Sequence, residues 1–146
     1  MARRCLLALL LALVGCGTST PVAPADSADG ATLPAAPLRT INTDAGKLRV
    51  DIRTGPQQPP SRGTQTIELA IVDAMTNAPA TGLTIVVVPW MPAMGHGTSL
   101  TPSVNEVSPG TYVITNVGFF MPGTWELRTV ISGPVADHAA PSFQIP

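Results

Sequence analysis

The sequence predicts an all-β protein, an immunoglobulin-like antiparallel β-sandwich of about seven strands that follows a signal peptide and a disordered tether. Apolar and polar residues alternate with a period of two in several short segments, as in strands with one buried face. Turn-forming Gly, Pro and Asn separate these segments, and no segment has a convincing helical pattern. With 146 residues, the chain is long enough for one folded domain.

The third predicted strand differs from the others in its pattern. Residues 83–89 are a nearly continuous apolar run rich in β-branched residues, which is typical of a central strand. A helix is the competing interpretation, but the β-branched residues and the flanking Gly82 and Pro89 favour a strand. The seven predicted strands cover residues 47–53, 64–73, 83–89, 104–107, 111–117, 124–132 and 139–145.

Residues 1–15 are predicted to form a lipoprotein signal peptide. Arg3 and Arg4 precede an apolar run that is too short to cross a membrane as a helix, and Leu-Val-Gly-Cys at its end fits the bacterial lipobox. This motif predicts cleavage before Cys16 and a lipid on the Cys16 sulfur, which anchors the protein to a membrane. An ordinary signal peptide with a chance cysteine is the alternative.

The mature protein is therefore expected in the bacterial cell envelope, lipid-anchored and facing the periplasm. Gly17 follows the anchor cysteine in place of the aspartate associated with inner-membrane retention, which favours the outer membrane. Cys5 leaves with the signal peptide, so no free thiol or disulfide remains. Residues 16–45 are rich in Pro and Ala and lack apolar periodicity, which predicts a disordered tether, and residues 46–146 form the folded domain.

The scarcity of charged residues argues against two classes of function. Once Arg3 and Arg4 are removed, six basic residues face nine acidic ones, and no basic patch is present to bind nucleic acid. Enzyme signatures are also missing: there is no Gly-x-Ser-x-Gly elbow, no phosphate-binding loop and no pair of carboxylates near a histidine. We therefore expect neither a nucleic-acid-binding protein nor an enzyme.

Residues 89–97, Pro-Trp-Met-Pro-Ala-Met-Gly-His-Gly, concentrate soft-metal ligands in an otherwise bland chain. Met91, Met94 and His96 are close in sequence, and the two glycines permit a loop that turns them toward one point. Thioether sulfur prefers Cu(I), and imidazole suits both Cu(I) and Cu(II). The sequence therefore predicts a copper site, with Cu(I) favoured. Zinc is disfavoured, because only two histidines and no free cysteine are available.

Met121 lies in a second such segment, Phe-Phe-Met-Pro-Gly-Thr-Trp, and is the candidate that would complete the site. Loops at the same end of a sandwich can approach each other, which would bring Met121 to Met91 and Met94. His138 is a weaker candidate and is expected on the surface. Structural roles stay open for all of them, because methionines fill irregular core gaps and His96 can hold its own loop by hydrogen bonding.

Three further side chains have expected structural places. Trp90 and Trp125 are predicted to anchor the core, and Tyr112 resembles the corner tyrosine of immunoglobulin-like domains, whose hydroxyl bonds nearby backbone. Within residues 111–117, simple alternation puts Tyr112 and Asn116 on one face and Val117 on the other.

Three motifs together resemble the YtkA-like domain family, which is related to the FixH proteins. They are Pro-Trp-Met-Pro-Ala-Met-Gly-His-Gly, Ser-Pro-Gly-Thr-Tyr and Phe-Met-Pro-Gly-Thr-Trp-Glu-Leu, in matching order within residues 48–145. The resemblance implies an immunoglobulin-like sandwich in an extracytoplasmic protein. It also implies copper handling and cytochrome oxidase assembly, with copper proteins or oxidase assembly factors as partners. FixH proteins have an N-terminal transmembrane helix where this chain has a lipobox, which argues against a role in the FixH membrane complex.

Two functional hypotheses follow from the sequence. The first is a lipid-anchored copper chaperone or buffer in which Met91, Met94, His96 and Met121 bind the metal. The second is a non-metal interaction module of the cell envelope, in which the methionine-rich loop is a structural clasp or contacts a partner protein.

Overall fold

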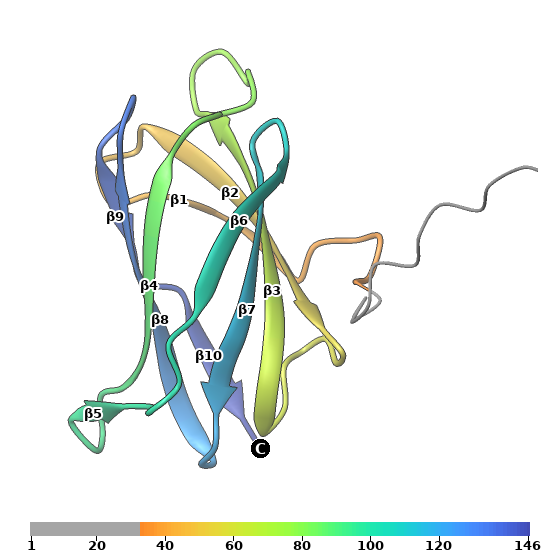
Figure 1. Ribbon diagram of the computed structural model, residues 1–146, viewed down its shortest axis with the longest axis vertical. Helices are drawn as coiled ribbons and strands as arrows, with labels where there is room; N and C mark the ends of the chain where they lie inside the picture. Colours follow the sequence, from red (N-terminus) through yellow and green to blue (C-terminus); the bar gives the residue numbers. More distant parts are fainter. Residues whose placement is uncertain (1–32) are drawn as a thin grey trace, which may run out of the picture.

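The computed structural model describes residues 33–146, which form a sandwich of two antiparallel sheets (Figure 1). In the first sheet the order is β1-β2-β3-β7-β6, formed by Arg39–Asn42, Leu48–Gly55, Gly63–Asp73, Thr111–Phe119 and Ser103–Ser108. In the second sheet the order is β10-β8-β4-β5, formed by Ser142–Ile145, Gly123–Ser132, Thr84–Met91 and His96–Gly97, and β9 (Asp137–Ala139) pairs with β8 beside β10. The predicted fold class, an antiparallel β-sandwich, is confirmed.

The N-terminal predictions lie outside the described residues. These are the signal peptide over residues 1–15, the lipidated Cys16 and the tether up to residue 32. Within residues 33–146, no helix is long and apolar enough to cross a membrane.

All seven predicted strands are present, and three short strands were not predicted. β1 lies in residues assigned to the tether: it is only four residues long, and its half-buried and exposed residues alternate without a strong apolar pattern. The last predicted strand is divided into β9 and β10 at Pro141, whose carbonyl accepts a hydrogen bond from the Leu127 N–H. The third additional strand, β5, lies in the segment expected to be a loop.

The core consists of apolar side chains from both sheets. Every second residue along a strand points inward to join it. At the end where β7 leads into β8, three aromatic rings close the core. The ring centroids of Phe119 and Trp125 are 5.6 Å apart, and those of Phe119 and Phe143 are 5.8 Å apart. These tilted arrangements are favourable for aromatic pairs, so this end of the sandwich is firmly packed.

β4 corrects the expectation of a central strand, because residues 84–89 lie at an edge of the second sheet and are covered on one face only. Ile85 and Val87 are buried, but Val86 and Val88 point outward and are 55% and 45% exposed. The continuous apolar run therefore obeys the same alternation as the other strands, because only one face of the second sheet is covered. Its outward valines form part of an apolar surface.

A β-bulge in β7 corrects the predicted facing of Val117. The register between β3 and β7 shifts after Gln65, so that Asn116 has no register partner in β3. The backbone of Asn116 has a φ of 59°. The extra residue reverses the alternation, so that Val117 is buried together with Ile114, and Asn116 is exposed. Asn tolerates this left-handed conformation better than most residues.

The Tyr112 hydroxyl makes the predicted connection to nearby backbone. It donates a hydrogen bond of 2.8 Å to the Ala80 carbonyl and accepts one of 3.0 Å from the Leu83 N–H. The Tyr112 ring is buried, and its two bonds fix the segment that enters β4.

Asp137 ties the turn between β1 and β2 to β9. Its buried carboxylate accepts hydrogen bonds from the Thr43 hydroxyl and from the backbone N–H groups of Ala45, Lys47 and His138. Burial alone would raise the carboxyl pKa, but these four bonds outweigh it and lower the pKa from 3.8 to about 2.

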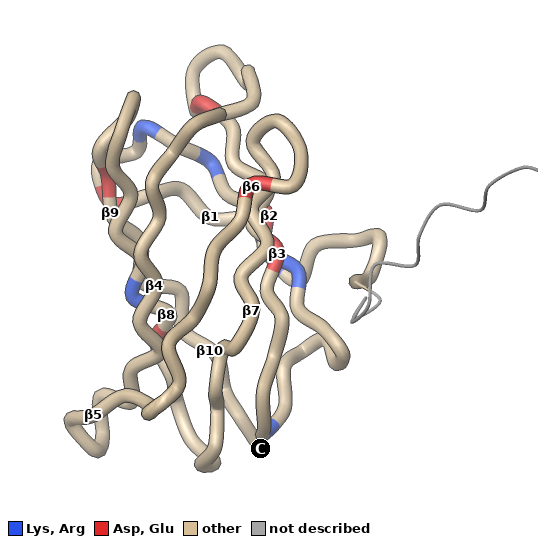
Figure 2. The backbone as a smooth tube through the Cα atoms, viewed as in Figure 1, with Lys and Arg blue, Asp and Glu red and all other residues tan. Residues whose placement is uncertain are grey.

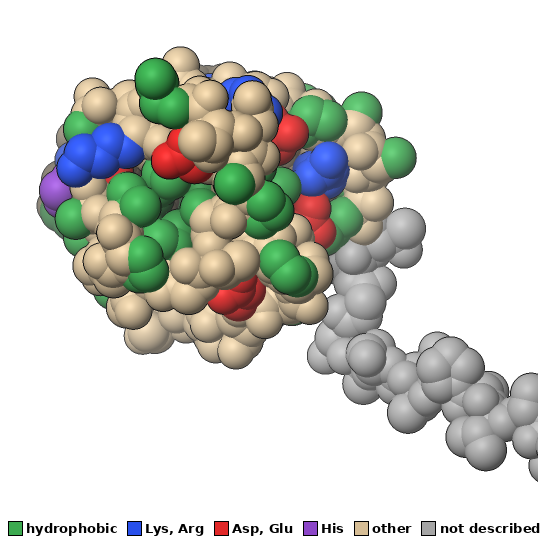
Figure 3. Space-filling view, turned by 90° about the horizontal axis from the view of Figure 1, so that it is seen from above, with side chains coloured by type: hydrophobic (Ala, Val, Ile, Leu, Met, Phe, Trp, Pro, Cys, Tyr) green, Lys and Arg blue, Asp and Glu red, His purple; other side chains and the backbone are tan. Residues whose placement is uncertain are grey.

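Charged side chains of both signs are interspersed at the end of the molecule opposite β5, as the end-on view shows (Figure 3).

We predict that Asp137→Asn reduces stability near neutral pH by about 1–3 kcal/mol, because an amide loses the charge-assisted bonds. The pKa of Asp137 is lower in the folded protein than its ordinary value of 3.8. The carboxylate therefore stabilises the fold above pH 3.8, and this contribution is lost as the pH falls toward about 2. Urea unfolding across this pH range should show that the difference in free energy of unfolding between wild type and Asp137→Asn becomes smaller as the pH falls.

Asp44→Asn is the matched control, since Asp44 is exposed in the same turn. A difference between wild type and Asp137→Asn that stays constant as the pH falls to about 2 would contradict this role of the carboxylate.

Candidate metal site

The segment predicted to be a loop is a β-hairpin. β4 continues through Met91, and β5 begins at His96, so only residues 92–95 form the turn. The N–H groups of Met94 and Gly95 both donate to the Met91 carbonyl, at 3.1 and 3.0 Å. Gly95 has a φ of 67°, a conformation that glycine adopts without steric cost.

Gly97 is required for a different reason. A Cβ at this position would lie 2.6 Å from the Pro89 carbonyl oxygen, which is backbone and cannot move aside easily. The absence of a side chain therefore lets β5 approach β4. The two glycines of the motif thus have separate roles: Gly95 turns the chain, and Gly97 allows close pairing.

The hairpin register brings Met91 and His96 together. They are direct partners across β4 and β5, and directly opposed residues of antiparallel strands direct their side chains to the same face. The Met91 side chain is 6% exposed and belongs to the core, whereas His96 is exposed at the end of the sheet. A buried thioether and an exposed imidazole are therefore neighbours.

The turn between β7 and β8 brings Met121 to the same end of the sandwich (Figure 1). The Trp125 Nε1–H donates a 2.9 Å hydrogen bond to the Met121 carbonyl and so holds the turn against the core. A Cβ added to Gly123 would lie 2.7 Å from the Met91 methyl carbon, which shows that Met91 contacts this turn. The Met121 side chain is half-buried and packs on the core.

Met94 is placed differently from the other three candidates. It lies in the hairpin turn between Met91 and His96, and its side chain is 57% exposed. The structure therefore brings Met91, His96 and the Met121 turn to one end of the sandwich, and it presents the Met94 thioether to solvent beside them.

The His96 ring contacts the backbone of its own hairpin. Its Nδ1 lies 2.8 Å from the Gly97 carbonyl oxygen, which can only accept a hydrogen bond. In a neutral ring, this bond places the proton on Nδ1 and leaves Nε2 as the nitrogen that can bind a metal. This arrangement, with one ring nitrogen donating to a carbonyl, is common for histidines that bind metals through the other nitrogen.

The two turns that carry the candidate ligands have no carboxylate, lysine or arginine side chains. Neither the hairpin from Met91 to Gly97 nor the turn from Gly118 to Thr124 contains Asp, Glu, Lys or Arg (Figure 2). Thioether and imidazole ligands are themselves neutral, so the site would bind a cation without neutralising its charge. Such a ligand set suits a soft, singly charged ion better than a hard divalent one.

Trp90 corrects the expectation of a second core tryptophan. It is half-buried, because its position in β4 directs it to the outer face of the sheet. The Arg128 guanidinium lies over its ring at 4.6 Å and forms a 3.0 Å ion pair with Glu126. Trp125, by contrast, is buried as expected. The Arg128 contact was not predicted, since it depends on the pairing of β4 with β8.

His138 does not join the candidate site. It lies in β9 opposite Val130, toward the other end of β8 from the Met121 turn, and it is exposed as predicted. Among residues 33–146, no three His, Cys, Asp or Glu side chains are grouped as a metal site. A copper site at the hairpin would therefore need methionine sulfur beside His96.

These features define a class of protein: a small antiparallel β-sandwich with a Met/His hairpin beside a second methionine-containing turn at one end. The family model described as YtkA-like matches residues 43–130, so the chain belongs to the YtkA-like family.

Comparison with solved structures finds a copper-bound variant of FetP from a uropathogenic Escherichia coli strain. It is similar to 75% of this chain and 94% of its own, at 10% sequence identity and a TM-score of 0.47. A comparison with curated protein sequences finds no significant match.

The different burial of the two hairpin methionines predicts different effects on stability. Met91→Ala should reduce the free energy of unfolding by about 2–5 kcal/mol, because it leaves a cavity against the Met121 turn. Met94→Ala should change it by less than about 0.5 kcal/mol, as expected of an exposed side chain. Denaturant unfolding of both variants measures the difference, and equal effects would contradict the placement of Met91 in the core.

Proposed function

We propose that this protein is an extracytoplasmic, membrane-anchored copper-binding protein that holds Cu(I) as a chaperone or buffer. The observation that carries the proposal is the direct pairing of Met91 with His96 in the hairpin. It supports the proposal because it joins a thioether and an imidazole at the end of the sandwich that also carries Met121.

His96 and Met94 would be the ligands accessible from solvent. His96 would bind through Nε2, since Nδ1 is engaged with the Gly97 carbonyl. The Met91 and Met121 thioethers would approach the ion from the core side. Bound copper would supply no reaction here, and the role proposed is storage and transfer without catalytic turnover.

The cell-envelope location is part of the same proposal. Cleavage before Cys16 and lipidation of its sulfur would place the domain at the membrane surface, facing the periplasm, with the outer membrane favoured by Gly17. Partners would be other copper proteins or oxidase assembly factors. Exchange of Cu(I) with them would use the exposed ligands, Met94 and His96.

A non-metal interaction module is the second candidate function, and the burial of Met91 favours it. Met91 packs on Gly123, and the Trp125 bond fixes the Met121 carbonyl, so both methionines already have structural roles. In this case the hairpin would be a clasp for the end of the sandwich, and exposed Met94 would contact a partner protein.

Cu(I) titration of the full chain against a chromophoric chelator under reducing conditions distinguishes the two functions. We expect wild type to compete for Cu(I), and His96→Gln and Met94→Leu each to weaken binding by at least about tenfold. Both side chains are exposed, so these changes should leave the fold unaltered.

The chain offers matched controls for both variants. Met75 is 89% exposed in the loop after β3, and His138 is exposed in β9, so Met75→Leu and His138→Gln should bind Cu(I) as wild type does. If replacing Met91, Met94 and Met121 by Leu and His96 by Gln together leaves Cu(I) affinity unchanged, the copper function is wrong.

Membrane anchoring is tested separately at Cys16. When expressed in a Gram-negative bacterium, the wild-type chain should incorporate labelled fatty acid and partition into the detergent phase, because Cys16 would carry lipid. Cys16→Ser should lose both properties, whereas Cys5→Ser should keep them, since Cys5 lies in the predicted signal peptide. Fatty-acid labelling that survives Cys16→Ser would contradict this assignment.

A further inference from the structure

The second sheet has an open edge along β4. On the side away from β8, β4 is paired only by β5, whose register covers Trp90 and Met91. Within the described part of the chain, no strand pairs with residues 84–89 on that side. Residues 84–88 of this apolar strand therefore have no partner strand on that side within the described part of the chain.

The direction of the backbone groups at this edge follows from the partner strand. The Leu127 N–H donates to the Pro141 carbonyl, on the side of β8 away from β4. Pro89 is opposite Leu127 and has no N–H, so the two form a pair without hydrogen bonds between them. Backbone direction alternates along a strand, and the N–H and C=O groups of Ile85 and Val87 therefore point to the open edge.

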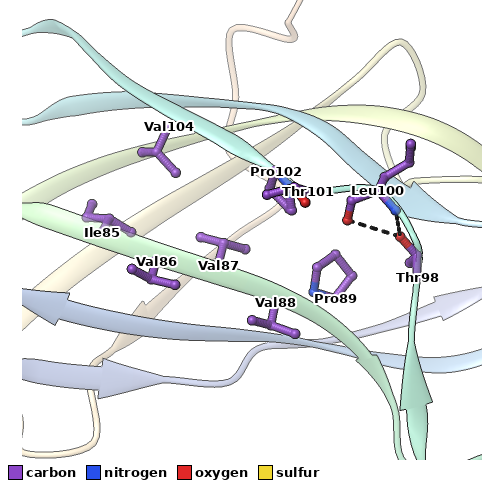
Figure 4. A pocket seen from close by; sticks show the side chains of 10 residues that line it. All are labelled: Ile85, Val86, Val87, Val88, Pro89, Thr98, Leu100, Thr101, Pro102 and Val104. Atoms are coloured by element: carbon purple, nitrogen blue, oxygen red, sulfur yellow. Dashed lines mark hydrogen bonds between the residues drawn. The ribbon is translucent and has the colours of Figure 1, made fainter.

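An apolar groove runs beside these backbone groups (Figure 4). β4 forms one wall, and the connection from β5 to β6 forms the other through Leu100, Pro102 and Val104. The groove has a volume of about 340 Å³, and none of its lining residues is charged. On the outer side, Val86 and Val88 extend the apolar surface.

The β4 edge lacks the features that protect the other edges. β1, β9 and β10 have four residues or fewer, and β6 contains an acidic residue and a register shift before Ser108. β4 has eight residues, no charge and no bulge, and it is blunted only at Pro89 and β5. A long, uncharged, apolar edge of this kind is a template for another strand.

We propose that the groove binds an extended, uncharged segment of a partner protein, which adds to β4 as a further strand. Main-chain bonds to Ile85 and Val87 would give the affinity, and alternate apolar side chains would fill the groove or cover Val86 and Val88. Apolar residues are required because a charged side chain in this groove would be desolvated without a partner.

The shape of the groove selects a single segment as its occupant. The connection from Thr98 to Pro102 runs alongside β4 and closes the groove on the side opposite that strand (Figure 4). A strand that belongs to a sheet, including β4 of a second copy, carries neighbouring strands that would meet this connection. The binding site uses neither Met94 nor His96, so it is independent of the proposed copper function.

A blocked peptide of alternating valine and threonine, with a lysine at each end, tests the proposal by amide NMR spectroscopy of the full chain. Peptide should slow the hydrogen exchange of the Ile85 and Val87 amides, which the groove otherwise leaves open. The same peptide N-methylated at its valines keeps its side chains but loses main-chain donors. It should bind at least about tenfold more weakly.

Leu100→Asp should also weaken peptide binding at least about tenfold, because it puts a charge on the far wall of the groove. Val107→Asp is the control, since Val107 is exposed on β6 away from the groove. Equal binding of the N-methylated peptide would overturn the proposal, as would unchanged exchange at Ile85 and Val87. Protection of these amides that depends on protein concentration without peptide would also overturn it, because a second copy would then fill the groove.

Discussion

The alternation of side chains along β4 is the constraint on which the rest of the structure depends. Because the second sheet is covered on one face only, every second residue of this strand must enter the core. Ile85, Val87 and Met91 do so, and Val88 and Trp90 are consequently directed outward. The inward or outward position of each residue along β4 therefore has three consequences. Met91 is a core residue, Trp90 packs against the Arg128 guanidinium on the surface, and Val86 and Val88 are exposed beside the open edge.

The same constraint explains why the two ends of the hairpin differ in character. Met91 enters the core at the last position of β4, and His96 is its partner at the first position of β5, where the sandwich no longer covers the sheet. The two side chains share a face, but only one of them reaches the interior. The placement of a buried sulfur beside an exposed imidazole is therefore a consequence of strand register at the rim of the core.

Much of this architecture could be predicted from the sequence, because a period of two in apolar residues is a local property. The strands, the corner tyrosine and the buried Trp125 follow from it. Features set by pairing between distant segments could not be predicted: the bulge at Asn116, the ring of Trp90 over β8 and the strand β1. Asn116 did carry a signal, since Asn is among the residues that tolerate positive φ.

For the candidate site, the sequence identified the residue types but not their burial. Four candidate ligands that look equivalent in sequence occupy three environments: Met91 in the core, Met121 half-buried, and Met94 and His96 exposed. A ligand that is also a packing residue cannot move far without a cost in stability, whereas an exposed ligand can. If copper binds, the core thioethers would fix the position of the ion, and the hairpin residues would control its entry and release. A site divided in this way would suit transfer of an ion better than permanent retention. The residues that would release the ion, Met94 and His96, are exposed and are the least constrained by packing.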